Sequence, residues 1–389
     1  MGVELFARVI ANVGYTSGAT NDAAVPQLAV PVEVGAPTPE SFTLVLRQTR
    51  FGGAVTVREV LGGTFDADVD LDLFGGRDAA GAFPLFPVPR LRTARAALRW
   101  ARTSLMVGSE TPLISDLDPL SLAAVGVPNF STAGNLWNWL PQVRASQELG
   151  GGRVRWAVQG AVIAPFVGVP YQGTELPTTG PYAVPVADAG ERSGLPFLQA
   201  RLRARWGGDA DALALADVRD AVTGEGPSEI GFGVHRGWVQ VAPGESHASS
   251  ALAMDVRLVL RRAVELRGEA YVGQLVQGLG GGAIGQSFGR PPMGAPEGAR
   301  GEPLRNAAGW AQLNVRPTES WLAGVGCGVD RVREDEQPVR RRNLPCAAHV
   351  RWQPIAPVLL GFEYRRLATW YDDVRATAHH FNLALGFEI

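Results

Sequence analysis

The stretch Asp66-Ala67-Asp68-Val69-Asp70-Leu71-Asp72-Leu73 alternates a carboxylate with an apolar residue at every step. Successive side chains of a β-strand point to opposite faces, so a strand collects the four aspartates on one face and the apolar residues on the other. An α-helix would scatter the same charges around its surface. The stretch therefore predicts a strand with water on one side and an apolar environment on the other.

The same period of two recurs along the chain, as where Arg201, Arg203 and Arg205 alternate with Leu202 and Ala204. In a transmembrane barrel, the apolar parity faces lipid and the polar parity faces the interior. Counting such segments predicts an all-β fold, a 16-stranded antiparallel transmembrane β-barrel. The predicted strands are 2–13, 41–58, 64–74, 90–101, 103–110, 140–149, 152–163, 196–206, 229–241, 250–261, 265–275, 306–316, 320–332, 343–353, 357–367 and 376–389.

The connections alternate in length, which favours one continuous barrel domain over residues 1–389. Outer-membrane barrels have short periplasmic turns at one rim and long extracellular loops at the other. No run of about 18 apolar residues occurs, which excludes a transmembrane helix. The segment 207–228 is an unexplained insertion at the short-turn rim. Tight connections are predicted at 61–63, 101–102, 150–151, 262–264, 317–319 and 354–356, and long ones at 14–40, 111–139, 164–195 and 276–305.

Strand register can also be predicted from pairs of side chains. Residues whose numbers sum to 673 are expected to face each other around position 336, which pairs Trp321 with Trp352 on the outward face. The same register places Cys327 opposite Cys346, where either a disulfide or two free thiols is possible.

Two further local features follow from the same side-chain patterns. Around Ala263, a sum of 526 brings opposite charges together and pairs Arg257 with Glu269. A change of side-chain parity predicts a β-bulge at Gly52-Gly53.

Composition and motifs argue against other functions. The formal net charge is −2, so no overall field points to a nucleic-acid partner. All 36 basic residues are arginines, which are planar cations suited to carboxylates and phosphates. The aspartate stretch lacks the glycine and glutamate that a calcium loop needs, since Leu71 and Arg77 stand there. We expect no metal site and no cofactor.

Two glycine-containing motifs are weak. The run Gly280–Gly285 matches a dinucleotide motif, but Pro291-Pro292 soon follows and an outer loop is predicted instead. The environment of Ser246 resembles a nucleophile elbow, yet no spacing to His379 or His380 supports a catalytic triad. We therefore expect a protein that is not an enzyme.

The stretch 41–160 contains the motifs Arg47-Gln48-Thr49-Arg50-Phe51-Gly52, Asp66 to Gly75, Leu91 to Ala96, Met106 to Pro112 and Pro141-Gln142-Val143-Arg144. In the order of these motifs, the stretch resembles the DcaP-like family of outer-membrane porins. This resemblance implies a homotrimer with a loop folded into each pore and a preference for anionic solutes such as dicarboxylates. The chain opens on Val3-Glu4-Leu5-Phe6 without a visible signal peptide, so the bacterial outer membrane is expected from the barrel pattern alone.

The resemblance also implies that loop 111–139 is the constriction of the channel. Cations on one wall and carboxylates on the other would give a transverse field that favours oriented polar solutes. Ordinary salt-bridged lumen residues are the alternative, and a solvated lumen face is favoured for the strand at Arg203. The candidate pore-lining residues are Arg47, Arg50, Asp66, Asp68, Asp70, Asp72, Arg95, Arg99, Glu110, Asp116, Asp118, Arg144, Arg201, Arg203 and Arg205.

Three functions remain open at this stage. The leading hypothesis is a passive diffusion porin for small polar or anionic solutes, surrounded by outer-membrane lipid. A second is a barrel plugged by its own loops that acts as a structural or anchoring protein. A third is a soluble secreted protein of two sandwiches, in which the apolar faces pack against each other instead of against lipid.

Overall fold

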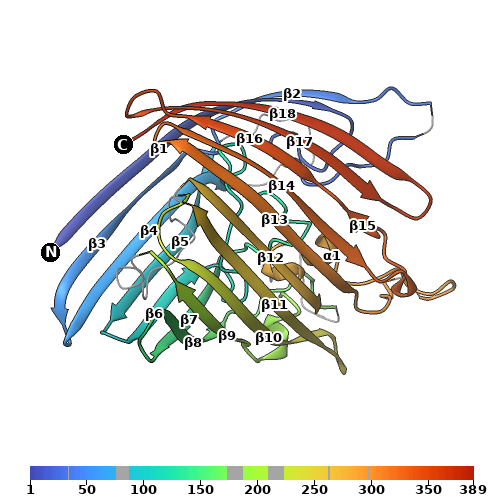
Figure 1. Ribbon diagram of the computed structural model, residues 1–389. Helices are drawn as coiled ribbons and strands as arrows, with labels where there is room; N and C mark the ends of the chain where they lie inside the picture. The colour runs from blue at the N-terminus through green and yellow to red at the C-terminus, as the bar shows by residue number, and fades with distance from the viewer. Residues whose placement is uncertain (34, 76–86, 173–186, 209–222, 262, 297) are drawn as a thin grey trace, which may run out of the picture.

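The computed structural model describes residues 1–33, 35–75, 87–172, 187–208, 223–261, 263–296 and 298–389. It is one closed antiparallel sheet, with both termini at the same rim (Figure 1). The strands are β1 Gly2–Ser17, β2 Glu40–Val45, β3 Arg50–Val60, β4 Gly63–Gly75, β5 Val88–Arg99, β6 Thr103–Glu110, β7 Leu140–Leu149, β8 Val154–Ile163, β9 Phe197–Trp206, β10 Ser228–Ala242, β11 Glu245–Arg261, β12 Val264–Gln274, β13 Arg305–Thr318, β14 Trp321–Val332, β15 Arg342–Asn343, β16 Cys346–Trp352, β17 Val358–Trp370 and β18 Arg375–Glu388.

The 18 labelled strands form a barrel of 16, because two barrel strands are each made of two pieces. Strands β2 and β3 both pair with β1, and β15 and β16 both pair with β14 and β17. The pairing of β1 with β18 closes the barrel. The predicted fold class is thus confirmed. Helical structure among the described residues is limited to short segments in the loops, namely η1 Glu191–Ser193, η2 Gln277–Leu279, α1 Gly282–Gly285 and η3 Glu334–Glu336, and none is long and apolar enough to span a bilayer.

The two faces of the barrel differ in chemistry as the alternation predicts. Leu202, Phe362 and Leu383 are 41%, 44% and 53% exposed on the outside, whereas Arg203 and Asp70 are buried on the inside. At the short-turn rim, Trp321 lies opposite Trp352 and the two rings stack with centroids 5.4 Å apart. Aromatic girdles of this kind flank the apolar band of transmembrane barrels. A soluble sandwich core would have buried these outward apolar residues.

The predicted register around position 336 is confirmed, and it brings Cys327 opposite Cys346. The two sulfurs form a disulfide between β14 and β16 on the outward face. The bond lies just beyond Leu344-Pro345, the two residues that separate β15 from β16 and interrupt the pairing of this barrel strand with its neighbours. Proline cannot donate a ladder hydrogen bond, which accounts for the interruption.

The predicted register around Ala263 is wrong by two residues. Arg257 lies opposite Arg267, and Glu269 lies opposite Asp255. A bulge between Val259 and Arg261 shortens the hairpin, so that the numbers of paired residues sum to 524 over most of the ladder. The faces are unchanged, because a shift of two positions preserves side-chain parity. Opposite charges then meet diagonally, with Arg257 Nη2 lying 2.6 Å from Glu265 Oε2.

The predicted bulge at Gly52-Gly53 is also wrong. Pairing is regular there on both sides, and the parity change comes instead from a turn at residues 46–49 between β2 and β3. The Thr49 amide donates to the Leu46 carbonyl across this turn, 3.0 Å apart. The turn points Gln48 and Thr49 into the barrel, where both are buried. Most of the insertion predicted at 207–228 lies outside the described residues.

Candidate pore constriction

Residues of segment 111–139 form hydrogen bonds with inward-facing side chains on strands all around the barrel, among them β9, β12, β13 and β17. The Ile114 amide donates to Gln199 on β9 (3.2 Å), and the Leu120 amide donates to Gln312 on β13 (2.7 Å). Ser121 Oγ donates to Glu363 on β17, 2.6 Å away. Leu113 and Ile114 belong to an apolar cluster with inward residues of β8 to β12. The segment therefore lies across the lumen and packs onto the wall.

Glu269 of β12 fixes the first part of this segment. Its carboxylate accepts hydrogen bonds from Ser115 Oγ (2.8 Å), the Leu117 amide (2.9 Å) and Trp310 Nε1 (3.0 Å). Three donors on one buried carboxylate hold its position tightly, because each lost bond would leave a buried polar group unsatisfied.

Gln48 fixes the later part of the segment from the opposite side of the barrel. Its amide nitrogen donates to the Ala123 carbonyl, and its amide oxygen accepts from the Val125 and Gly126 amides, each at 2.8 Å. The turn that interrupts β2 and β3 is what turns Gln48 inward. The interruption between β2 and β3 therefore also determines the position of the loop.

The loop also meets the wall backbone to backbone. Gly134 has a φ of +108°, and a Cβ built on it would lie 2.4 Å from the Gly309 Cα of β13. No side chain fits in that space, and the left-handed conformation also favours glycine. This contact seats the loop directly on β13.

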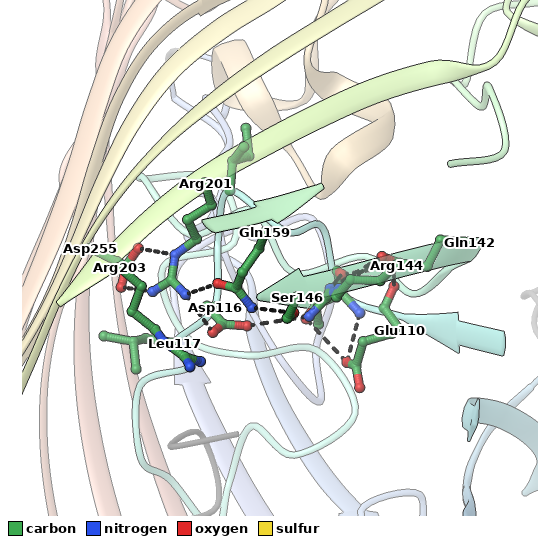
Figure 2. Close-up of polar contacts among 12 residues, drawn as sticks. Glu110, Asp116, Leu117, Gln142, Arg144, Ser146, Gln159, Arg201, Arg203 and Asp255 are labelled. Carbon is green, nitrogen blue, oxygen red and sulfur yellow. Dashed lines mark hydrogen bonds and ion pairs between the residues drawn. The ribbon is translucent and has the colours of Figure 1, made fainter. Parts of the chain in front are cut away.

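Arg201 is the centre of a buried ion cluster beneath the loop (Figure 2). Its guanidinium contacts Asp116 of the loop at 3.0 Å, Asp255 of β11 at 2.5 Å and Glu229 of β10 at 2.6 Å, and its side chain is fully buried. It also donates to Gln159 of β8, 2.9 Å away. A buried cation needs this degree of compensation, since desolvation otherwise exceeds the Coulomb gain.

The other two arginines of β9 join the same cluster. Arg205 pairs with Glu229, and Arg203 lies within 4.0 Å of Glu229 and 3.9 Å of Glu148. Arg201, Arg203 and Arg205 are only 2%, 4% and 1% exposed, so the expected solvated face is wrong for them. Strand alternation identified their inward side but gave no sign of the loop that covers it.

The aspartates of β4 form a ladder with arginines of the neighbouring strands. Asp66 pairs with Arg99 at 2.5 Å and Asp68 with Arg95 at 2.9 Å, and these pairs are about one third exposed. Farther along β4, where the aspartates are more deeply buried, Asp70 pairs with Arg50 and Arg92, and Asp72 pairs with Arg90. Glu110 completes the ladder through Arg95 at 2.5 Å. Each carboxylate has a cation, so this wall is charged but nearly neutral overall.

A cavity of about 600 Å³ lies between the loop and the barrel wall. Arg50, Arg92 and Arg95 line it from β3 and β5, and Asp118 lines it from the loop. Toward the short-turn rim its lining includes Arg351 of β16 and Glu363 of β17. The cavity thus has charged side chains of both signs on facing elements.

The structure brings some predicted residues to this cavity and leaves others elsewhere. Arg50, Asp70, Arg95, Glu110 and Asp118 line it. Arg47 is instead buried against the Phe74 ring, 4.3 Å from its centroid. The remaining residues lie in the β4 ladder, beside the start of the loop near Thr111, or in the Arg201 cluster. These are Asp66, Asp68, Asp72, Arg99, Asp116, Arg144, Arg201, Arg203 and Arg205.

Sequence analysis missed four residues that matter here: Gln48, Arg92, Glu269 and Arg351. Arg92 and Arg351 stand at inward positions of predicted strands, so parity alone would have found them. Gln48 and Glu269 act through the loop, and no local pattern signals a contact between residues so far apart in sequence.

The weak motifs do not form sites in the structure. Ser246 is on β11 and His379 and His380 are on β18, which are not neighbouring strands. The Gly280–Gly285 run includes a short helix with left-handed Ala283 and Ile284, and both are buried in a cluster with Leu28, Leu304 and Val332. Among the described residues, no group of three or more His, Cys, Asp or Glu is placed to hold a metal ion.

Solved structures with this architecture include outer-membrane channels and porins. The DcaP channel of Acinetobacter baumannii matches with a TM-score of 0.69 and 13% identity, over 100% of this chain and 97% of that one. This chain has the porin fold. An anion-selective porin of Comamonas acidovorans matches this porin fold with a TM-score of 0.56 and 11% identity, over 100% and 98% of the two chains. OprB of Pseudomonas putida matches with 0.52 and 10%, over 100% and 94%.

The sequence comparisons add nothing to this finding, because no protein-family model and no curated protein matches the chain. The resemblance to DcaP-like porins is thus confirmed for the fold. At these identities, the likeness concerns the porin fold alone, and solute preference has to be argued from this chain's own residues.

Proposed function

We propose that this protein is an outer-membrane porin, a passive diffusion channel for small polar solutes. One observation carries the proposal: a charged cavity of about 600 Å³ lies inside a closed barrel whose outer face is apolar. A lipid-facing exterior requires a membrane, and a polar interior of this kind serves the passage of water-soluble molecules. Loop 111–139 acts as the constriction, since it bounds the cavity through Asp118 and the residues that follow.

Planar-bilayer recording of the folded, inserted protein tests this proposal directly. We expect discrete ohmic steps that persist without an applied ligand. Insertion can be verified separately, by protease protection of the protein in lipid vesicles. Protein that inserts but produces no conductance would refute the proposal.

We further propose a preference for anions, and Arg351 supports it. Among the described residues no carboxylate pairs with Arg351, which lines the cavity near the short-turn rim. The other arginines that line the cavity pair with carboxylates, so Arg351 adds a positive charge that no ion pair among the described residues offsets. Solutes with a carboxylate or phosphate would be attracted to it.

Exchange of Arg351 for glutamate tests the anion preference. R351E should move the reversal potential in a KCl gradient toward cation selectivity while leaving single-channel conductance of the same order. R236E is the matched control, because Arg236 lies on the outward face of β10 and should change nothing. Equal reversal potentials for R351E and the wild type would overturn the preference.

A plugged barrel with an anchoring role is the second candidate. It is favoured by residues of the β9–β10 connection that enter the interior: Thr223 lines the cavity, and the Glu225 carbonyl accepts from Arg257 Nη2 at 2.6 Å. Absence of conductance together with correct insertion would select this function.

We also propose a homotrimer, since one matching structure, OmpT of Vibrio cholerae, is described in a trimer form.

A further inference from the structure

The outward face near the long-loop rim carries a row of arginines in cross-strand register. Arg331 of β14 lies opposite Arg342 of β15, Arg342 lies opposite Trp370 of β17, and Trp370 lies opposite Arg375 of β18. All four point outward, because the adjacent residues in each strand are buried in the barrel interior. These buried neighbours are Asp330, Asn343, Thr369 and Ala376.

The height of this row can be fixed from the Trp321–Trp352 pair at the opposite rim. Ten residues of β14 separate Trp321 from Arg331. That is roughly 33 Å along a strand, or about 25 Å along the membrane normal at the usual tilt. The apolar band of such barrels is about 25 Å tall. The row therefore lies at the lipid headgroup level on the long-loop side.

Carboxylates of the described residues offset the positive charge of the row only in part, through the exposed Arg331–Glu334 pair. The guanidinium groups of Arg342 and Arg375 lie over the Trp370 ring, each 4.9 Å from its centroid. Neither forms an ion pair with a carboxylate among the residues the structure describes. Arg331 is 74% exposed and has only Glu334 at 3.9 Å, which is itself exposed.

One carboxylate of the adjacent turn is already engaged. Asp372, in the turn between β17 and β18, accepts from Arg290 and from Arg341 at 2.9 Å. These hydrogen bonds lower the pKa of Asp372 below its ordinary value. The carboxylate therefore stays ionised and is occupied by Arg290 and Arg341, and among the described residues no ion pair joins Arg375 to a carboxylate.

The Cys327–Cys346 disulfide fixes the geometry beside the row. Arg331 lies four residues beyond Cys327 on β14, and Arg342 lies four residues before Cys346 across the interrupted ladder. A covalent bond at this point holds β14 to the β15–β16 strand beside the break between β15 and β16, where the Gly328 amide donates to the Pro345 carbonyl at 2.9 Å. The disulfide thereby holds the backbones of Arg331 and Arg342 side by side on neighbouring strands.

We propose that this row, Arg331, Arg342 and Arg375 around Trp370, binds the phosphate of a phosphorylated glycolipid in the outer leaflet. Guanidinium groups match phosphate oxygens in geometry and charge, and the Trp370 ring suits the boundary between headgroup and acyl chain. The inference rests on the membrane location in the proposed function, but not on an open channel.

Native mass spectrometry of the detergent-solubilised protein tests the proposal with lipid A as the probe. We expect diphosphoryl lipid A to bind more tightly than the same acylated disaccharide without phosphates. R342Q and R375Q should each weaken the binding of the diphosphoryl form about fivefold, the effect of removing one cation near a charged lipid surface. A millimolar excess of inorganic phosphate should not displace the lipid, because the acyl chains supply part of the affinity.

R236Q is the matched control, because Arg236 is also outward and lies 5.7 Å from a tryptophan ring, that of Trp238, but belongs to no arginine row. R236Q should bind lipid A as the wild type does. Equal losses in R342Q and R236Q would overturn the proposal, as would equal binding of the phosphorylated and unphosphorylated lipids. A change in subunit number in R342Q would place the row in a protein interface and also overturn it.

Bilayer conductance of the same variants separates the two proposals. R342Q should conduct as the wild type does, since the row lies outside the lumen. Wild-type conductance with phosphate-independent lipid binding defeats only the lipid proposal. Phosphate-dependent binding without conductance defeats only the porin proposal.

Discussion

At the scale of single residues, burying a charge inside this barrel costs desolvation free energy, and most of the buried charges described above have oppositely charged partners. The cluster of Arg201, Arg203 and Arg205 with Asp116, Glu229 and Asp255 contains three cations and three anions. Removing one buried partner leaves an uncompensated charge, which costs far more than the intact pair contributes. The identity of such residues is therefore constrained by stability before any role in transport.

Arg201→Met should destabilise the barrel strongly. Three carboxylates lose their common cation, and we expect a loss of about 3–5 kcal/mol in the free energy of unfolding. Urea titration of the protein in lipid vesicles, followed by tryptophan fluorescence, measures this. Arg99→Gln is the control, because the Arg99–Asp66 pair is about one third exposed and should change stability by no more than about 1 kcal/mol. Similar losses in both variants would contradict the central role of Arg201.

At the scale of elements, the loop and the strand break depend on each other. Gln48 stands in a turn that interrupts a barrel strand, and its three hydrogen bonds hold residues 123–126 of the loop. A regular strand at 46–49 would have placed the side chain in a different direction.

Gln48→Ala should loosen the loop without preventing assembly of the barrel. The buried loop groups that lose their partner cost about 1–3 kcal/mol, so the loop should leave its position more often. Single-channel recording should then show increased current noise and a broader conductance distribution. Gln147→Ala, on the outward face of β7, should leave the recordings unchanged. Identical noise in Q48A and wild type would argue against this anchor.

The disulfide between β14 and β16 is the second element-scale feature with a measurable effect. Its cysteines are 19 residues apart, which corresponds to about 3 kcal/mol in the chain-entropy account. The double variant C327S/C346S should lose about that much stability and keep its conductance. Intact mass with and without reductant reports whether the bond is present. Two free thiols in unreduced protein would contradict the structure.

Sequence alone predicted the strands well because lipid and water impose a period of two on every strand. It predicted the 673 register because Trp321 and Trp352 mark the same rim. It failed at Ala263, where matching opposite charges directly across the strands overlooked a bulge that makes them meet diagonally. It also failed for Gln48 and Glu269, since their partners lie about 75 and 150 residues away along the chain.

At the scale of the whole molecule, the apolar exterior is the feature on which the membrane assignment depends. Leu383→Arg, on the outward face of β18, should destabilise the inserted barrel by about 2–4 kcal/mol, as expected for a cation near the bilayer midplane. Leu61→Arg, in the turn between β3 and β4, should cost no more than about 1 kcal/mol because it lies at the rim. Unfolding titrations in vesicles compare the two variants. Equal effects would mean that the exterior does not face hydrocarbon.

The contact of Gly134 with Gly309 limits how the width of this channel can change. On that side, loop and wall backbones already touch, so no substitution can bring them closer and any side chain can only push the loop away. Substitutions at this contact can consequently move the loop in one direction only, away from β13. Variation in solute size among related barrels would have to come from loop residues that line the cavity, such as Pro119 and Leu120.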